Sequence, residues 1–567
     1  MVKTKKNTQK KGDTTMKGRM RLLCFLTVVT IVGAACGSTT PNNVSQQGHT
    51  PGVLRTPGPD PLTLDPALVT DAGSHLYVSN IFDGLLTMVP SDQDVEFTLP
   101  DGTKTKVKGL AIAPDIAVAI PDPISNPDGT ITYIFELRQD IFFHLGRQVN
   151  AQDVKYSLER ATAPETLSTA AELYLSDIVG VRDKLRGRTR TVEGVKVIDD
   201  FTISITINGP TVDFLWKLTY PTAMVVDREQ IESNPRTWTR LPNGTGPFKL
   251  EIYQQGRQLV LVGNQDYHLG APKLTRIEFN LSGGSILTAY ENGETDVSGV
   301  GIADVDRVRD PNDPLSREVV EAPSLSTSYI GFNMSKPPFD DILVRQAMTQ
   351  AIDIDTIARV VLKDMIAPAH SIVPPGMLGY TPIQSKLTYD AQKARDLLAK
   401  SKYAVNMPTI VLTVSGQGAT AGPVIEAMIE MWRKELSLNV KIEQVESTAF
   451  FDNLKRGKYQ MFSLGWVADY PDPADFLDLK FHSANSVANN ETQYSNAEVD
   501  ALLDRARVES DPQTRAQLYQ QAETIILNEA PWLPFLHGKT LLVVKPYVKG
   551  YVPSLLGEPF YRFIEVN

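Results

Sequence analysis

The sequence predicts an α/β fold, because segments with strand and helix patterns alternate from about residue 52 to the end of the chain. The clearest unit covers residues 409–442. TIVLTV over 409–414 is typical of a strand, apolar residues then fall at helical spacing from Val424 to Leu436, and residues 438–442 alternate as a second strand. A β-α-β unit of this kind implies two parallel strands joined by a right-handed crossover.

Other elements follow from the same patterns. Strands are expected over 131–137 (ITYIFEL), 201–207 (FTISITI) and 459–464 (YQMFSL). Asn150 is expected to cap a helix with Val154 and Leu158 on its buried face. Residues 344–361 are also predicted to be helical, with a restart at Asp353. Asp511 and Pro512 open a further helix, whose expected core face is Ala516, Tyr519, Ala522 and Ile526.

The stretch GWVADYPDPADFL, residues 465–477, follows the predicted strand 459–464. Pro471 and Pro473 prevent that strand from continuing. Ligands of open α/β sheets bind outside the carboxyl ends of strands, so this loop is expected to line a binding site. The neighbouring acids Asp472 and Asp475 are interpreted as solvated loop residues. The polar segments 415–418 and 485–489 are weaker candidates for the same cleft.

The first fifty residues predict targeting rather than fold. Basic residues lead into the apolar run LLCFLTVVTIV, which is far shorter than the roughly 20 residues that span a bilayer as a helix. Small residues and Cys36 follow, as in a secretory signal peptide. Residues 1–35 are therefore expected to be a signal peptide. The polar residues 36–51 are expected to form a flexible tether.

Cys36 lies where a bacterial lipoprotein is cleaved and lipidated, and we expect it to carry a lipid. The resemblance is to the lipobox, although Gly33 stands where leucine is usual. The alternative is plain cleavage after Ala35, which leaves a free thiol. Loss of Cys24 with the signal would make Cys36 the only cysteine of the mature chain. A lipid and a tether would hold the protein at the outer face of the cytoplasmic membrane.

Composition excludes several classes. The chain has 567 residues, and its 42% hydrophobic and 22% charged residues are ordinary for a globular protein of two or more domains. The net charge is −10 although the leader is basic, so the body is acidic and nucleic acid is not an expected partner. Two cysteines allow no disulfide framework or cysteine-based metal site.

No catalytic motif is found in the sequence. The seven histidines show no HExxH spacing, and no Gly-x-Ser-x-Gly motif is present. Gly538-Lys539-Thr540 lacks the earlier glycine of a phosphate loop, because that position holds Leu533. A catalytic residue, a metal site or a cofactor is therefore not expected, although histidine–carboxylate metal sites built from distant segments stay open without support in the sequence. The predicted loop holds a ligand rather than reacting with it.

Taken in order, short segments resemble the peptide/nickel-type (family 5) substrate-binding lipoproteins of bacterial ATP-driven importers. The matching segments are residues 64–66 (LDP), 80–86 (NIFDGLL), 130–138 (TITYIFELR), 150–160 (NAQDVKYSLER), 243–248 (NGTGPF), 264–272 (NQDYHLGAP), 289–297 (AYENGETDV), 329–345 (YIGFNMSKPPFDDILVR), 373–376 (VPPG), 389–398 and 465–476. The match runs from about residue 55 to 550. Residues 91–109 depart from it as an insertion, Leu145 replaces a usual acid, and His268 stands where tryptophan is common.

The resemblance implies a bilobal α/β fold of the periplasmic-binding-protein type II class, with two hinge segments and an extra small domain on the first lobe. The first lobe is expected to comprise 52–88, 193–325 and 540–567. The extra domain would cover 89–192, and the second lobe 326–539. The hinges would lie near 324–329 and 536–541.

The resemblance also implies the site. In peptide-binding relatives, the aspartate of a W-x-x-D motif receives the α-ammonium group of the ligand, and Asp469 matches that residue. Trp466 and Tyr470 are expected to add a cation–π contact or an apolar wall. Core packing is the alternative for both. The expected partners are a small solute such as a peptide, and membrane permease subunits, with the chain itself a monomer.

The implied function is capture of a peptide, or another solute with an amino group, for an ABC importer. A peptide-sensing receptor lipoprotein is the first alternative. Binding of an oligosaccharide or a metal chelate on the same scaffold is another. An enzyme at the outer face is the least favoured, since the motifs tested above are missing from the sequence.

Overall fold

The computed structural model describes residues 49–98, 104–284, 286–382, 386–416 and 421–567. The predicted signal peptide, Cys36 and most of the tether lie outside these residues. Residues 47–567 form one compact unit. Of the described residues, none belongs to a helix that combines the length and the apolarity needed to cross a membrane.

The predicted α/β class is confirmed by the arrangement of sheets and helices. One sheet has the order β1 (Val53–Pro57), β10 (Arg276–Asn280), β9 (Gln258–Gly263) and β8 (Phe248–Gln254). Its apolar face and helix α1 (Ala72–Ile81) enclose a core that includes Leu54, Phe248 and Ile277. β1 runs parallel to β10, so the N-terminal strand pairs with a segment far along the chain.

A second sheet has the order β4 (Ile124–Ser125), β5 (Ile131–Glu136), β7 (Thr202–Ile207) and β6 (Val195–Asp199). Both strands predicted in this region are present. Helix α2 (Ala151–Ala161) begins at Asn150, whose side chain accepts from the backbone of Asp153 in a capping box. The sheet extends to residue 207, so a domain boundary at residue 192 would divide it.

The largest sheet has the order β11 (Val297–Gly299), β17 (Trp532–Val544), β12 (Val319–Phe332), β16 (Met461–Val467), β14 (Ile410–Ser415) and β15 (Val440–Val445). The short strand β13 (Ala367–Pro368) also pairs with β17. β14 and β15 are parallel and flank helix α12 (Pro423–Leu436), which confirms the predicted β-α-β unit.

The remaining helices and strands complete the unit. They are β2 (Leu86–Thr98), β3 (Lys104–Pro114), α3 (Ala170–Leu175), α4 (Val181–Leu185), α5 (Phe214–Lys217), α6 (Arg228–Ser233), α7 (Ile286–Glu291), α8 (Val305–Arg309), α9 (Ile342–Gln350), α10 (Ile354–Thr356), α11 (Ala391–Lys400), α13 (Ser447–Leu454), α14 (Leu477–Phe481), α15 (Ala497–Val508), α16 (Pro512–Glu529), β18 (Val548–Lys549) and β19 (Glu565–Val566). The predicted break between α9 and α10 is confirmed, with Asp353 capping α10. On α16, Tyr519, Ala522 and Ile526 are buried as predicted, and Ala516 is half-buried.

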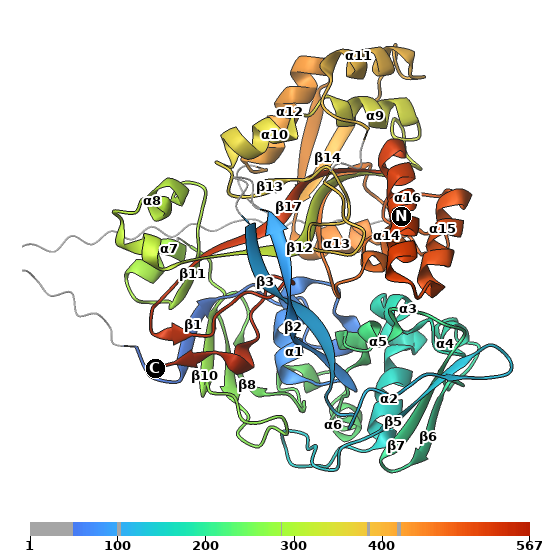
Figure 1. The fold of residues 1–567 in the computed structure, drawn as a ribbon, viewed down its shortest axis with the longest axis vertical. Helices are drawn as coiled ribbons and strands as arrows, with labels where there is room; N and C mark the ends of the chain where they lie inside the picture. The colour runs from blue at the N-terminus through green and yellow to red at the C-terminus, as the bar shows by residue number, and fades with distance from the viewer. Residues whose placement is uncertain (1–48, 99–103, 285, 383–385, 417–420) are drawn as a thin grey trace, which may run out of the picture. The chain divides into compact units, whose positions relative to one another are not determined.

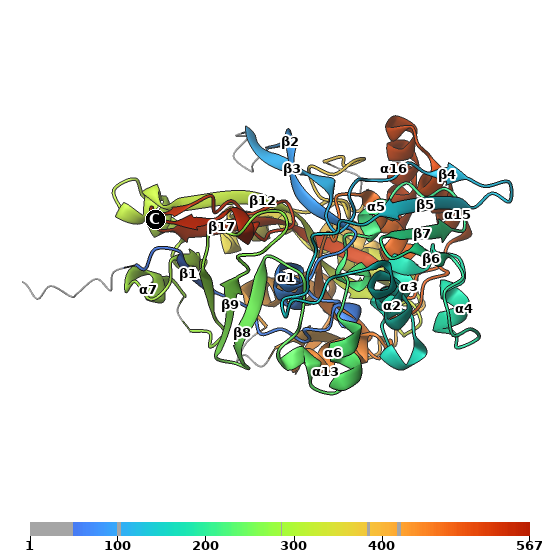
Figure 2. The ribbon, with the colours of Figure 1, turned by 90° about the horizontal axis from the view of Figure 1, so that it is seen from below.

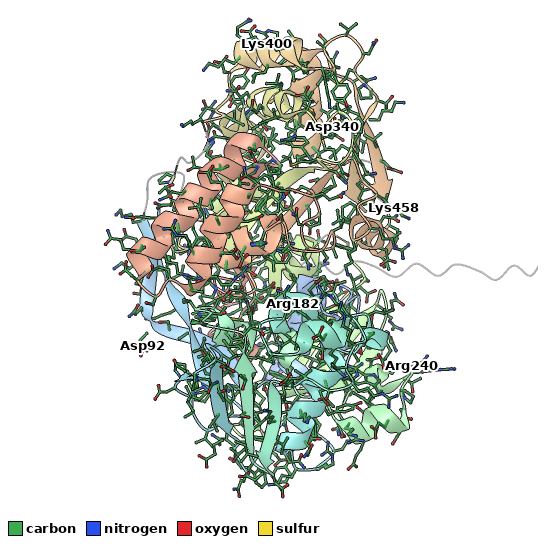
Figure 3. The ribbon with its side chains drawn as sticks, turned by 90° about the vertical axis from the view of Figure 1, so that its right-hand side faces the viewer. Asp92, Arg182, Arg240, Asp340, Lys400 and Lys458 are labelled. Atoms are coloured by element: carbon green, nitrogen blue, oxygen red, sulfur yellow. The ribbon has the colours of Figure 1, made fainter. Side chains whose placement is uncertain are left out.

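Two groups of elements lie apart in the fold. Figure 1 shows α9, α11 and α12 at one end of the ribbon and β5, β6 and β7 at the other. Figure 3 labels Asp340 and Lys400 in the first group and Arg182 and Arg240 among the elements opposite. β12 and β17 are long paired strands of the largest sheet, and Figure 2 shows them side by side from below.

The ladder between β12 and β17 is interrupted where the hinges are expected. Regular pairing stops after Pro323 and resumes at Thr327. Gly538 lies opposite this break, where an added Cβ atom would be 1.9 Å from Ser326 Oγ and 2.2 Å from Ser324 Oγ. A side chain at this position would force the Ser324 and Ser326 hydroxyls to move, so the two segments approach closely here. The break therefore gives both strands a point at which their pairing can change.

Of residues 91–109, which depart from the family pattern, 91–98 and 104–109 lie in the paired strands β2 and β3. Phe97, near the end of β2, is buried in a core cluster with Ile372, Val373 and Met377. A Cβ atom at Gly376 would lie 2.4 Å from the Phe97 ring, so the two segments are in close contact. The β2–β3 hairpin therefore links the β3–Asp115 region to a segment next to the largest sheet (Figure 1).

Candidate functional site

A cavity of about 340 Å³ lies next to β16. One wall comes from β16 and the residues after it, including Leu464, Trp466 and Asp469. The facing walls come from α1, from the start of β2, from α3 and from residues 554–563. The predicted loop is thus at the cavity, and several chain segments that the sequence did not mark are there with it.

Strand β16 begins at Met461, two residues later than predicted, and ends at Val467, three residues later, so Gly465 and Trp466 belong to it. It pairs with β12 along its whole length, and Thr327 is opposite Trp466. On its other side, β14 pairs only with Met461 and Phe462. In the described residues, the outer edge of β16 beyond Phe462 has no strand partner. That free edge leads directly to Asp469.

Asp469 lies at the cavity wall as predicted, partly exposed. The Tyr174 hydroxyl, from α3 on the facing side, donates a hydrogen bond to its carboxylate. The backbone N–H of Asp469 donates to Asp475 Oδ2 at 2.8 Å, which fixes the turn after β16. Burial raises the pKa of the Asp469 carboxyl to about 7, while the Tyr174 hydrogen bond and the Lys480 ammonium group oppose that rise.

Asp475 is a correction to the sequence analysis, because it is fully buried rather than solvated. It accepts hydrogen bonds from the Asp469 backbone and from Trp466 Nε1, at 2.8 and 3.2 Å. Burial raises the pKa of Asp475 well above its usual range, and the Asp469 carboxylate adds to the rise. A protonated Asp475 would leave Asp469 as the carboxylate that carries the negative charge at this wall.

Trp466 is half-buried at the cavity wall. It lines the cavity and also packs against the core cluster that contains Tyr329, Phe476 and Trp532. The Lys480 ammonium group lies 3.5 Å from the centre of its ring, a cation–π contact. Lys480 also pairs with Glu491 at 3.0 Å. The ring face that was expected to meet a ligand ammonium is therefore covered by a protein cation.

Tyr470 has a different position from the one expected. Its side chain is buried in the core that contains β1 and β8 rather than in the cavity wall. Its hydroxyl donates to Asp213 Oδ2 at 2.9 Å. The backbone turn after Asp469 points the ring away from the cavity, so Tyr470 joins the loop to the facing group instead of contacting a ligand.

Asp472 is also buried, contrary to the sequence analysis. It caps the short helix that begins at Pro473 and forms a bidentate ion pair with Arg515 of α16. Arg515 Nε in turn donates to the Ala506 carbonyl at 2.9 Å. After the two prolines the loop turns back, and the buried carboxylates of Asp472 and Asp475 hold it in place.

Sequence reasoning missed several cavity residues. Tyr174 and Tyr220 stack with ring centres 3.8 Å apart, and Lys480 and Glu491 form a buried pair. Tyr174 and Lys480 lie on short helices, and Tyr220 and Glu491 lie in loops, so no local pattern marked them. Of the two polar segments, 485–489 contributes Ala488 and Asn489 to the cavity. Ser415 does not line it, and residues 417–418 lie outside the described part of the chain.

Three more ionisable side chains lie close together, and two of them, Asp83 and Asp115, line the cavity. Asp83, Asp115 and His268 place one potential ligand atom each within 4.8 Å of one another. His268 Nε2 lies 2.7 Å from Asp115 Oδ1. Burial raises the pKa of Asp83 to about 8 and that of Asp115 to about 7. Because these residues are far apart in sequence, no motif revealed the group.

Solved structures with a similar fold align with most of this chain. The chain aligns with the Escherichia coli murein tripeptide binding protein MppA at a TM-score of 0.78, with 24% identity, covering 92% of this chain and 99% of that one. The unliganded open form of the same protein gives a TM-score of only 0.63. These structures show that the chain has the fold of the periplasmic binding proteins it aligns with.

The family follows from the sequence comparisons. The model of the bacterial extracellular solute-binding proteins, family 5, matches residues 107–488. The chain belongs to this family, whose members bind solutes and are not enzymes. Two relatives are each 26% identical: the oligopeptide-binding protein OppA of Bacillus subtilis, with 96% of this chain and 99% of the relative covered, and heme-binding protein A of Haemophilus influenzae, with 97% and 100%.

Proposed function

We propose that this protein captures a peptide, or another solute with an amino group, and delivers it to the permease of an ABC importer. The observation that carries the proposal is Asp469, a carboxylate at the cavity wall directly after the free edge of β16. Family membership supports the solute-binding role. The names of the relatives, which include both peptide and heme binders, leave the solute to be decided by the site.

The carboxylate suits an α-ammonium group. A charge pair about 4 Å apart gains on the order of 4 kcal/mol at an effective dielectric constant near 20, before desolvation costs. Asp469 has Tyr174 as a neutral hydrogen-bond donor, and Lys480 is already paired with Glu491. Among the described residues no cation forms an ion pair with Asp469, and a ligand ammonium group would supply one.

The strand edge suits an extended chain. Backbone groups of an extended peptide can pair with the outer edge of β16, as in other cases of β-strand addition. Thr87, Met88 and Val89 of β2 line the same cavity from the facing side. Main-chain pairing at these edges would hold a peptide without reading its side chains.

The lobe layout remains a proposal. We infer a first lobe around the β1–β10–β9–β8 sheet and a second lobe around β14–β16, with the hinges at the break in the β12–β17 ladder. The β4–β5–β7–β6 sheet favours extending the extra domain past residue 192, to residue 207. The Tyr174–Asp469 and Tyr470–Asp213 bonds would then form only when the lobes close.

The location is proposed from the sequence alone. A lipid on Cys36 and the tether would keep the protein at the outer face of the cytoplasmic membrane, near its permease. Acting there as a monomer, it needs no cofactor for capture. A peptide-sensing receptor would use the same site, and it differs only in the membrane partner.

The β2–β3 hairpin is expected to favour closure. Phe97→Ala removes its buried contact with residues 372–377, and the closed state loses that packing. Ligand affinity should fall up to about tenfold, about 1.4 kcal/mol, in calorimetric titration. The matched control is Phe142→Ala, since Phe142 is half exposed. Equal affinity of the Phe97 variant and the wild type would show that the hairpin has no part in closure.

Ligand affinity is expected to depend on pH through Asp469. Its pKa of about 7 means that acidification protonates the carboxylate, while an α-amino group of pKa about 8 stays charged. Affinity should therefore fall about tenfold between pH 7 and pH 5.5. Asp469→Asn should bind weakly with no such slope. A flat profile in the wild type would contradict the charge-based account.

The function is tested by identifying the natural ligand. The full chain is purified from its native membrane, denatured, and the released small molecules are analysed by mass spectrometry. Peptides with free amino termini are expected. A heme or an oligosaccharide recovered in stoichiometric amount would overturn the proposal, because neither offers an α-ammonium group to Asp469.

A further inference from the structure

A cluster of three ligand-type side chains forms where three distant segments meet. Asp83 follows α1, Asp115 follows β3, and His268 lies in the turn after β9. Their nearest oxygen and nitrogen atoms all lie within 4.8 Å of one another. His268 stands where tryptophan is common in the family. The cluster therefore includes a histidine that the family pattern does not predict.

The surroundings leave one oxygen of this cluster without a partner. Asp83 is 4% exposed, and its Oδ2 accepts no hydrogen bond from the described residues. Its Oδ1 accepts from the Tyr267 hydroxyl at 3.2 Å. Asp83 and Asp115 both line the cavity. A buried, unpaired carboxylate oxygen next to a second carboxylate is costly unless a cation or a proton compensates for it.

Basic side chains of the protein do not compensate for the Asp83 carboxylate by direct contact. In the described part of the chain, Asp83 has no ion-pair partner. Arg138 is held by Asp140 at 2.7 Å. Arg562 lies with its guanidinium over the Tyr267 and Phe563 rings. The two carboxylates therefore lie beside one imidazole and each other at the cavity wall, while the Arg138 and Arg562 charges act on Asp115 without pairing with Asp83.

We propose that Asp83, Asp115 and His268 bind one divalent transition-metal ion such as Zn²⁺. One imidazole nitrogen and two carboxylate oxygens are a common ligand set for such ions, with bonds of about 2.0–2.2 Å. Ligand atoms this close together need only small side-chain movements to reach that geometry. The Tyr267 hydroxyl on Asp83 would orient that carboxylate from behind.

The remaining coordination positions would face the cavity, because two of the three ligands line it. Water, or a donor atom of a bound solute, could occupy them. The site lies on one side of the cavity, and Asp469 lies on another wall built by β16. Metal binding is thus proposed independently of the amino-group site, and neither depends on the other.

The test is a titration of the chelator-washed full chain with Zn²⁺ alone, followed by calorimetry. One equivalent should bind, and Co²⁺ should give visible absorption bands of a bound ion. His268→Gln and Asp115→Asn should each lower the affinity at least tenfold. Asp83→Asn keeps the side-chain shape and provides a third variant should either of the others fail to fold.

The matched control is His370→Gln. His370 also forms a histidine–aspartate pair, with Asp355 at 3.1 Å, but it is only half-buried and belongs to no three-residue ligand cluster in the described part of the chain. Its loss should leave Zn²⁺ affinity unchanged. Bound Zn²⁺ should also raise the melting temperature of the wild type and not of His268→Gln.

Absence of saturable binding in the wild type would overturn the proposal and favour a proton shared by the two carboxylates. Equal Zn²⁺ affinity in the wild type and His268→Gln would overturn it as well. Peptide titrations run with and without Zn²⁺ keep the two sites separate. Peptide binding by a chain that binds no metal would reject the metal site and leave the proposed function standing.

Discussion

Replacing Asp469 with asparagine is expected to weaken peptide binding at least tenfold, about 1.4 kcal/mol. The substitution keeps the shape of the side chain and its capacity to accept from Tyr174, but removes the negative charge that faces the cavity. The neighbouring acid Asp475 cannot substitute, because it is fully buried and its pKa is raised well above the usual range. Calorimetric titration at pH 7 measures the loss.

The fold of this variant should be intact. The folded-state pKa of Asp469 is about 7, above the ordinary value, so folding favours the protonated carboxyl group. The stability that this preference contributes is lost as the pH rises through 7. Asp469→Asn should thus melt no lower than the wild type at pH 8. Asp452→Asn is the matched control, since Asp452 is an exposed acid on α13 beside the cavity-lining Phe451. A loss of affinity in the control as large as in Asp469→Asn would show that only general charge is involved.

Replacing Asp472 with alanine is expected to destabilise the fold by about 3–5 kcal/mol, because it leaves the buried Arg515 guanidinium without its carboxylate. The loop that presents Asp469 is held by this pair, so affinity should fall as well. Chemical denaturation monitored by circular dichroism measures the change in the free energy of unfolding.

The matched control is Glu430→Ala, which breaks an exposed pair with Arg433 at 2.6 Å. Exposed pairs contribute about 0–1 kcal/mol, so little change is expected there. If both variants lost the same small amount of stability, the Asp472–Arg515 pair would not be what fixes the loop.

Local patterns predicted the elements well. The β-α-β unit around α12, the capped helix α2 and the helix after Asp511 depend on periodicity and capping residues that are close together in the chain. The extension of β16 through Trp466 was missed because its pairing with Thr327 of β12 overrides the turn signal of the prolines that follow. Element ends depend on partners, which a single sequence does not show.

The site was predicted only in part for the same reason. Asp469 could be identified from its place after a strand and from a family motif. The burial of Asp472 depends on Arg515, and the position of Tyr470 depends on Asp213. The partner of Asp469, Tyr174, is on α3, far away in the sequence. Such contacts arise from tertiary packing, and no local spacing encodes them.

The central claim is that the Asp469 carboxylate holds the amino group of a ligand. A paired titration tests it most directly: short peptides with free amino termini are compared with the same peptides carrying an N-acetyl group, which removes the charge. For the wild type, the free peptides should bind at least tenfold more tightly, and Asp469→Asn should abolish the difference. Equal affinities of the wild type for the free and the acetylated peptides would contradict the account.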